Sequence, residues 1–173
     1  MRVCMNVCLL LVLGSCQRLA GPVAPGPLGT SRGEAPGAAP AIDLPITQGE
    51  QLALSSLRGK YVVLVFWESG NAASRAESPN LRKIYQQFRS RGLEIYGVSL
   101  DTHRQNWRRA IREDALSWPQ VIEKKGRESN LVLAYGVPAL PYTVLLDPQG
   151  RVLARGLYGR ALGQKISEYI PLD

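Results

Sequence analysis

Asn71, Ser74 and Glu77 follow one another at a spacing of three residues, where a long amphipathic segment begins. Side chains at this spacing lie on the same face of a helix. Asparagine and serine are good N-cap residues, and a glutamate in the first turns complements the helix dipole. A free helix N-terminus also binds carboxylates and other anions. The spacing therefore indicates either helix capping or an anion-binding site.

Hydrolysis by a Ser74 nucleophile is disfavoured, because the sequence offers it no suitable base. His103 is the only histidine, and it lies in a polar strand-to-helix junction, SLDTHRQNW, at the start of a different predicted helix. Glu77 would need an unusual arrangement to accept the serine proton. A single histidine also disfavours a transition-metal site, and we expect neither a metal nor a cofactor.

The first residues predict export and a lipid anchor. Residues 3–13 form an apolar stretch that has the length of a signal-peptide core and is too short to span a bilayer. Residues 13–16, LGSC, resemble the bacterial lipobox, whose cysteine receives a diacylglycerol. We expect a signal peptide over residues 1–15 and lipidation of Cys16, which anchors the chain to a membrane; an ordinary signal peptide with an incidental Cys16 is the alternative. Gln17 is not the aspartate associated with inner-membrane retention, so this resemblance implies the periplasmic face of the outer membrane in the bacterial cell envelope.

The three cysteines, Cys4, Cys8 and Cys16, all lie in this leader and at its end. Two of them leave with the signal peptide and the third is acylated, so the folded domain contains no thiol. Disulfides, thiolate nucleophiles and zinc–thiolate sites are thereby excluded, in a compartment that would permit disulfides.

Residues 17–40 are rich in Gly, Pro and Ala and show no hydrophobic periodicity. With Cys16, they form the predicted membrane tether, residues 16–40, and a flexible coil of this length reaches about 27 Å. Residues 41–173 then form one domain of ordinary size.

The formal charge of the whole chain is +7. Arg104, Arg108 and Arg112 form a row along one predicted helix, but no aromatic residues are interleaved with them, so we expect a solvated face and no nucleic-acid partner.

Apolar runs and amphipathic segments alternate after residue 40, which is the pattern of an α/β sheet protein. The run at 61–67, YVVLVFW, is apolar on both faces, as in a covered parallel sheet. The other expected strands lie at 51–54, 93–100, 142–147 and 151–157, and the expected helices at 72–91, 101–114, 130–135 and 162–170, the second of them capped by Asp101 or Thr102. The last two strands form an antiparallel hairpin, so the fold class is α/β with a central mixed sheet and helices on both faces.

Three blocks, at 52–67, 66–81 and 135–152, resemble the thioredoxin-like TlpA and redoxin family, which is related to AhpC/TSA proteins. The second block, FWESGNAASRAESPNL, is similar to the family's FWASWCxPCRAEMPxL active-site stretch, and the third, YGVPALPYTVLLDPQGRV, to its YGVxGxPTTFLIDxxGxI. The resemblance covers nearly the whole predicted domain. It implies a thioredoxin-like fold and, in an intact family member, thiol-disulfide oxidoreductase activity.

The resemblance places Asn71 and Ser74 at the positions of the two redox cysteines. A thiolate stabilised at a helix N-terminus performs the family's exchange chemistry, and neither an amide nor a hydroxyl replaces it. Gly70 stands where the family has tryptophan and Val65 where it has a buried polar residue, whereas Glu77 is retained. These changes imply a degenerate site without catalytic residues.

Leu140-Pro141 matches the family's cis-proline, whose loop pairs through its backbone with extended substrate segments. The resemblance thus implies binding residues Asn71, Ser74, Glu77, Leu140, Pro141 and Tyr142. We expect a non-redox binding or accessory module for an extended peptide or protein. The alternative is an enzyme of the family's usual kind, a thiol-disulfide oxidoreductase or a peroxidase.

The anchor gives the first testable prediction. Replacing Cys16 by alanine removes the sulfur that carries the diacylglycerol, so the variant should leave the membrane fraction while the parent protein stays in it. Metabolic labelling with a fatty acid, followed by membrane fractionation, checks this. A parent protein found wholly in the soluble periplasmic fraction would refute the anchor.

Overall fold

The structure is a computed structural model, and it describes residues 37–172. The predicted signal peptide, the lipidation site Cys16 and the tether as far as residue 36 lie outside the described residues. Five strands form a mixed sheet in the order β5-β4-β3-β6-β7. In chain order they are β3 (Tyr61–Trp67), β4 (Leu93–Ser99), β5 (Gln120–Ile122), β6 (Tyr142–Leu146) and β7 (Val152–Arg155).

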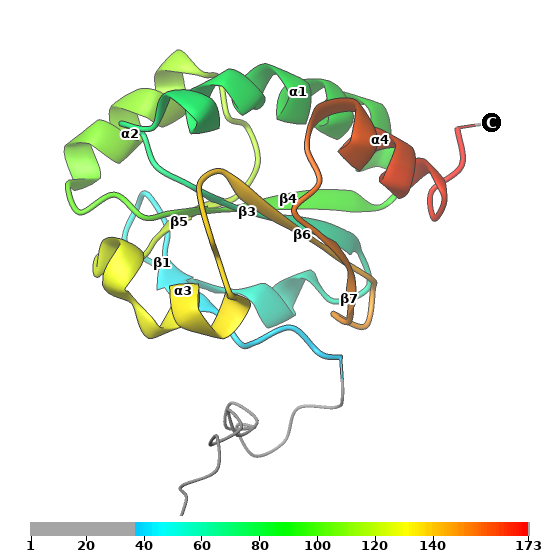
Figure 1. Cartoon of the computed structure of the whole chain (residues 1–173), viewed down its shortest axis with the longest axis horizontal. Coiled ribbons are helices and arrows are strands. Elements are labelled where there is room, and N and C mark those ends of the chain that lie inside the picture. The colour runs from blue at the N-terminus through cyan, green and yellow to red at the C-terminus, as the bar shows by residue number, and fades with distance from the viewer. Residues whose placement is uncertain (1–36, 173) are drawn as a thin grey trace, which may run out of the picture. The chain divides into compact units, whose positions relative to one another are not determined.

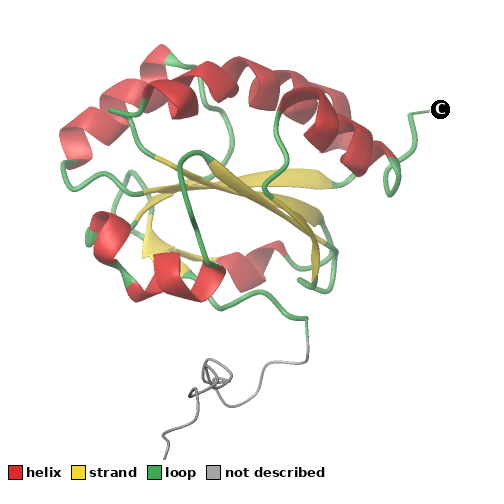
Figure 2. Ribbon diagram, in the orientation of Figure 1, coloured by secondary structure: helices red, strands yellow, loops and turns green. Residues whose placement is uncertain are grey.

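Helices cover both faces of this sheet, as Figure 2 shows, which confirms the predicted α/β architecture. α1, α2 and α4 lie over one face, and α3 lies over the other together with the N-terminal hairpin (Figure 1). The helices are α1 (Ala72–Phe88), α2 (Arg104–Glu113), α3 (Asn130–Tyr135) and α4 (Gly159–Ser167). The hairpin strands are β1 (Asp43–Pro45) and β2 (Gln51–Ala53), and three short 3-10 turns are η1 (Leu54–Leu57), η2 (Arg89–Arg91) and η3 (Gly126–Glu128).

The central strand β3 joins the two hydrophobic cores. Its odd-numbered residues Val63, Val65 and Trp67 pack in the core beneath α1. Its even-numbered residues Val62, Leu64 and Phe66 pack on the α3 side. This alternation follows from the two-residue period of a strand, and it explains why the sequence of β3 is apolar throughout.

β3 also sets the direction of its neighbours. It runs parallel to β4, with Tyr61 opposite Leu93, and antiparallel to β6, with Phe66 opposite Tyr142. The carboxyl end of β3 therefore leads into α1 beside the start of β6. This arrangement brings the segment around residue 71 and the loop before Tyr142 to the same end of the sheet.

The folded domain begins earlier than the composition indicates. Residues 37–40 belong to the predicted tether, but Ala38 bridges to Arg151 and the N–H of Ala39 donates to the carbonyl of Gly150 at 3.0 Å. The side chain of Ala39 is buried in the core on the α3 side. Small residues in a Gly/Pro/Ala stretch can pair along a strand edge, and composition alone does not reveal it.

The cap of α2 differs from the prediction. The sequence indicates Asp101 or Thr102, whereas the N-cap is His103 and α2 starts at Arg104. The final helix begins at Gly159 and ends at Ser167, slightly earlier than predicted. β1 and β5, each three residues long, are not predicted at all, because so short a strand shows no clear alternation.

Two residues of the arginine row on α2 hold the β1–β2 turn in place. The Arg104 guanidinium donates to the carbonyl of Ile46 at 2.6 Å, and Arg108 donates to the carbonyl of Thr47. Two of the three arginines in the row therefore bind backbone carbonyls of the protein itself, so no phosphate ligand is needed to explain them. Among the described residues, none of the helices is both long and apolar enough to cross a bilayer.

Candidate functional site

The candidate site lies where β3 leads into α1. Asn71 is the N-cap of α1, and its side-chain oxygen accepts a hydrogen bond from the N–H of Ser74 at 2.8 Å. The helix-capping interpretation is therefore confirmed for Asn71. Because the N–H of Ser74 donates to Asn71, one of the backbone donors that a bound anion would use is already occupied.

The side chain of Ser74 points inward from the first turn of α1. The residue is 3% exposed, and its hydroxyl makes no hydrogen bond with any described part of the chain. It lines a cavity of about 10 Å³ beneath the helix, together with Val65, Trp67, Ser78, Leu81, Leu116, Trp118 and Gln120. A buried hydroxyl with no adjacent base is not placed to attack a substrate at the surface.

Gln120 crosses the sheet to reach this cavity. Its side chain passes over Gly97, where even a Cβ atom would lie 2.3 Å from the amide oxygen, and that oxygen accepts a hydrogen bond from the Trp67 indole at 3.1 Å. The floor of the site is therefore an amide and two indoles rather than an ionisable group. Sequence reasoning did not identify Gln120, since nothing in the pattern of β5 marks it.

Glu77 lies on α1, but its side chain binds the N-terminus of a different helix, α4. Although only 8% exposed, it accepts a hydrogen bond from the N–H of Gly159, the first residue of α4, at 2.7 Å. Its second oxygen accepts from the side chain of Asn80 at 3.0 Å. The capping and dipole role expected for Glu77 is thus present, but at the N-terminus of α4.

Tyr158, the residue before α4, connects this contact to the proline loop. The Leu140–Pro141 peptide bond is cis, and the hydroxyl of Tyr158 donates to the carbonyl of Pro141 at 2.9 Å. Burial raises the pKa of Tyr158, with smaller contributions from Tyr142 and Glu77. Its hydroxyl therefore stays protonated at neutral pH and keeps donating to the loop.

At the proline loop, backbone groups rather than large side chains are available for binding. The side chains of Leu140 and Tyr142 are buried in the core on the α3 side, whereas Pro138 and Ala139 are exposed. Within residues 37–172, the backbone N–H of Leu140 makes no hydrogen bond. An unpaired N–H next to exposed small residues suits pairing with an extended chain.

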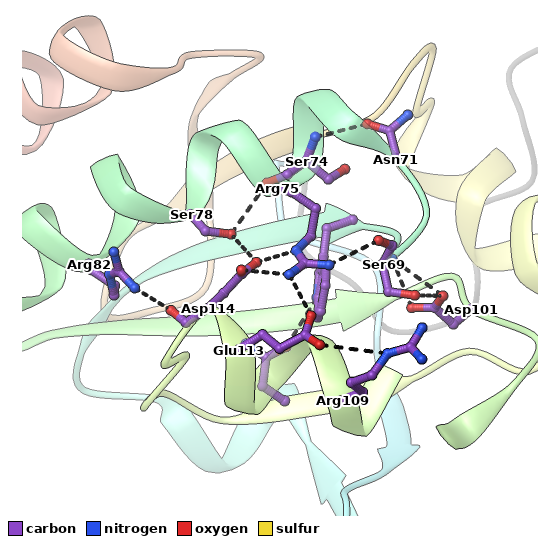
Figure 3. A network of polar contacts seen from close by, with 12 residues as sticks. Ser69, Asn71, Ser74, Arg75, Ser78, Arg82, Asp101, Arg109, Glu113 and Asp114 are labelled. Carbon is purple, nitrogen blue, oxygen red and sulfur yellow. Dashed lines mark hydrogen bonds and ion pairs between the residues drawn. The ribbon is translucent and has the colours of Figure 1, made fainter. Parts of the chain in front are cut away.

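The loop between β3 and α1 is held by a buried carboxylate (Figure 3). Asp101 accepts hydrogen bonds from the N–H of Ser69 at 3.1 Å and from its hydroxyl at 2.5 Å. The hydroxyl of Ser99 donates to the same carboxylate at 2.7 Å. Asp101 therefore organises this loop instead of capping α2.

An ion pair fixes the first turns of α1 to the end of α2 (Figure 3). Arg75 binds Asp114 through two nitrogens, at 2.5 and 2.8 Å, and reaches Glu113 at 3.0 Å. The hydrogen bond to Asp114 is the main reason why the pKa of Arg75 is raised. Ser78 also donates to the carboxylate of Asp114, and Arg82 donates to its backbone carbonyl. The bidentate contact between Arg75 and Asp114 is both strong and directional.

Sequence spacing contains no signal for this network. Ser69 and Asp101 are 32 positions apart, and Arg75 and Asp114 are 39 apart. The structure also shows a special backbone conformation here, because Ala115, directly after Asp114, has a φ of 49°. This left-handed conformation costs an alanine about 1 kcal/mol, and it lets the chain turn sharply after α2.

The described residues hold no group of three or more His, Cys, Asp or Glu side chains that could bind a metal ion. The site therefore consists of a capped helix start, a buried hydroxyl, and a proline loop with an unpaired N–H. This arrangement can bind extended backbone. It contains no cysteine, because no residue after Cys16 is one.

The contact between Glu77 and Gly159 gives a stability prediction. Replacing Glu77 by alanine leaves the N–H of Gly159 without its acceptor, so the free energy of unfolding should fall by about 1 to 3 kcal/mol. Urea unfolding followed by circular dichroism measures this. The matched control is Glu50→Ala, at an exposed turn, which should change stability by less than about 0.5 kcal/mol. Equal effects of the two variants would rule out the capping role.

The helix start gives a prediction about redox geometry. The double variant Asn71→Cys with Ser74→Cys, made in the chain from residue 33 onward, should form an intramolecular disulfide on mild oxidation and gain weak reductase activity. The two positions share one face of the first turn, and a helix N-terminus lowers the pKa of a thiol there. Mass spectrometry and an insulin-reduction assay check this, with the two single variants as controls. Thiols that stay free, or that bridge only between molecules, would show that these are not the redox positions.

Several known proteins resemble this chain. Residues 37–155 match the model of the AhpC/TSA family. The thiol-disulfide oxidoreductase ResA of Halalkalibacterium halodurans is 30% identical over 125 residues, which are 72% of this chain and 69% of the relative. ResA of Bacillus subtilis is 29% identical over 134 residues, covering 78% and 73% of the two chains.

Solved structures agree with these sequence matches. The thioredoxin domain of a thiol-disulfide oxidoreductase from Bacteroides vulgatus is 34% identical and superposes with a TM-score of 0.73, covering 77% of this chain and 95% of that one. A thiol-disulfide oxidoreductase from Bacteroides fragilis gives the same identity and TM-score and covers 76% and 98%. The resemblance inferred from the three sequence blocks is confirmed: this chain belongs to the AhpC/TSA family and has a thioredoxin-like fold.

Proposed function

We propose that this protein is a lipid-anchored member of the cell envelope that binds extended segments of peptide or protein at its cis-proline loop and performs no thiol chemistry of its own. One observation carries the proposal. The fold and the proline loop of a thiol-disulfide oxidoreductase are present, but no residue after Cys16 is a cysteine.

The chemistry supports the absence of redox activity. Disulfide exchange needs a thiolate nucleophile and a second thiol to release the mixed disulfide. Asn71 instead caps α1 with its amide oxygen, and Ser74 has its hydroxyl buried beneath the helix. Catalysis depends on the site rather than on the fold, so the activity named for the relatives does not transfer to this chain.

Three features of the loop support peptide binding. The N–H of Leu140 has no partner in the described chain, and Ala139 beside it is exposed. The carbonyl of Pro141 is held by Tyr158, which keeps the loop in one conformation. Leu133, on the helix that precedes the loop in the chain, is an apolar side chain that is 70% exposed. A preorganised loop binds with a smaller entropic cost than a flexible one.

The rival function is the activity of the relatives, several of which are named thiol-disulfide oxidoreductases. It would require thiols that a partner protein supplies. For location we propose the periplasmic face of the outer membrane, on the basis of Cys16 and Gln17.

Activity and binding are tested separately. The purified chain from residue 33 onward should not accelerate insulin reduction or peroxide consumption by dithiothreitol above a buffer blank, because it has no thiol. The Asn71→Cys, Ser74→Cys variant serves as the positive control. Turnover by the unmodified chain that is abolished by Ser74→Ala would overturn the non-redox assignment.

Binding is tested with the full chain in cells. A photoreactive side chain placed at Ala139 or Asn71 should be cross-linked to partner proteins, whereas the same group at the exposed Glu50, on the β1–β2 turn, should not. Equal capture at all three positions, or none at Ala139, would contradict binding at the proline loop.

A further inference from the structure

Different segments of the chain lie at the two ends of the central sheet. The carboxyl end of β3 leads to Asn71 and lies beside Tyr142, which pairs with Phe66. At the other end, the N–H of Tyr61 donates to Gly92, and Leu146 pairs with Val62. A strand advances about 3.3 Å per residue, so the seven residues of β3 separate the two ends by roughly 20 Å.

The chain enters the described domain at the end opposite the candidate site. Ala38 bridges to Arg151, and Ala39 donates to Gly150, in the turn between β6 and β7. Gly59 donates to Pro148 in the same turn. The first described residues therefore lie at this end, which we call the entry end and define by residues 37–39, 58–61, 89–93 and 147–151.

The entry end presents exposed cations. The exposed basic residues of the segments that define it are Arg58, Lys60, Arg89, Arg91 and Arg151. Two described carboxylates accompany them, those of Glu94 and Asp147, and both residues are buried. They pair with Lys60 at 3.1 Å and with Arg151 at 2.6 Å from beneath. The outward surface of these segments is therefore positive.

The C-terminal turn lies beside this end, where Arg91 donates to the carbonyl of Pro171 at 2.8 Å. Tyr169 packs on Tyr61, and Lys165 pairs with Glu168 at 2.5 Å. The loops at the candidate site carry a mixture of both signs. Glu68 pairs with Arg127 at 2.8 Å, and Glu123 and Glu128 lie close in sequence to Lys124 and Lys125.

We infer that the entry end is a membrane-facing surface for anionic phospholipid headgroups, which orients the candidate site away from the bilayer. This inference rests on the anchoring part of the proposed function. Two observations support it: the described chain begins at this end, and five exposed basic residues lie there with only two described carboxylates, both buried. Basic side chains near an anionic surface attract it over about a Debye length, so the tether brings them within range.

The orientation has a consequence for function. The proline loop lies at the far end of the sheet, so a bilayer beneath the entry end leaves the loop open to extended segments from the surrounding compartment. Without such a surface, an anchor alone would leave the orientation of the domain at the membrane undetermined.

The test measures vesicle binding without the acyl anchor. The chain from residue 16 onward, carrying Cys16→Ala, is sedimented with vesicles of phosphatidylcholine and phosphatidylglycerol and with vesicles of phosphatidylcholine alone. Binding should require phosphatidylglycerol and weaken as salt is raised. The double variant Arg58→Gln, Arg89→Gln should bind roughly twenty-five-fold more weakly, because each basic residue near the surface contributes about a fivefold change. The matched control Lys124→Gln, Lys125→Gln, at the site end, should bind nearly as the parent does.

Equal loss in the two double variants would overturn the inference, because the attraction would then be diffuse. Circular dichroism shows whether both variants are folded. A second measurement reads orientation in the acylated protein: a fluorophore at Gln149→Cys should be quenched by headgroup spin-labelled lipid more than one at Ala139→Cys. The reverse order would also overturn it. Failure of the anchor itself appears separately, as release of the parent protein from membranes.

Discussion

The burial of β3 on both faces is the constraint on which the rest of the domain depends. Its side chains alternate between the two cores, so helices must cover both sides of the sheet. Its pairing, parallel with β4 and antiparallel with β6, brings the start of α1 and the proline loop to one end. The same pairing places the entry of the chain at the other end. Site and attachment are therefore separated by the length of one strand.

The candidate site keeps its shape through polar contacts that involve no sulfur. Asp101 holds the loop before α1, the Arg75–Asp114 pair holds its first turns, and Glu77 ties α1 to α4. Each of these carboxylates accepts charge-assisted or backbone hydrogen bonds, and such contacts are worth most where water is partly excluded. These contacts hold the start of α1 in place without a disulfide.

A family name alone would assign an oxidoreductase. The relatives carry that name, and the fold matches theirs over most of the chain. The residues at the reacting positions nevertheless decide what the site can do, because an amide and a buried hydroxyl neither attack a disulfide nor resolve one. The proposal of backbone recognition rests on what remains, an N–H in the proline loop that is unpaired within the described residues.

The sequence by itself determined the order and type of the main elements and the composition of the site. The strand at 61–67 and the helix at 130–135 were predictable to the residue. A run that is apolar on both faces and a short capped helix can both be recognised from neighbouring residues alone. The absence of thiols after Cys16 is also a property of composition. Asn71 was recognisable as a cap, since capping depends only on neighbouring residues.

Tertiary structure alone decided how the remaining polar groups are used. Glu77 caps α4 rather than its own helix, Asp101 binds Ser69 rather than capping α2, and Gln120 reaches across Gly97 to Trp67. Residues 37–40 join the sheet edge although their composition is that of a linker. In each case the partner lies far away in sequence. A carboxylate or an amide binds whichever donor the packed elements bring within about 3 Å, and only the fold determines which donor that is.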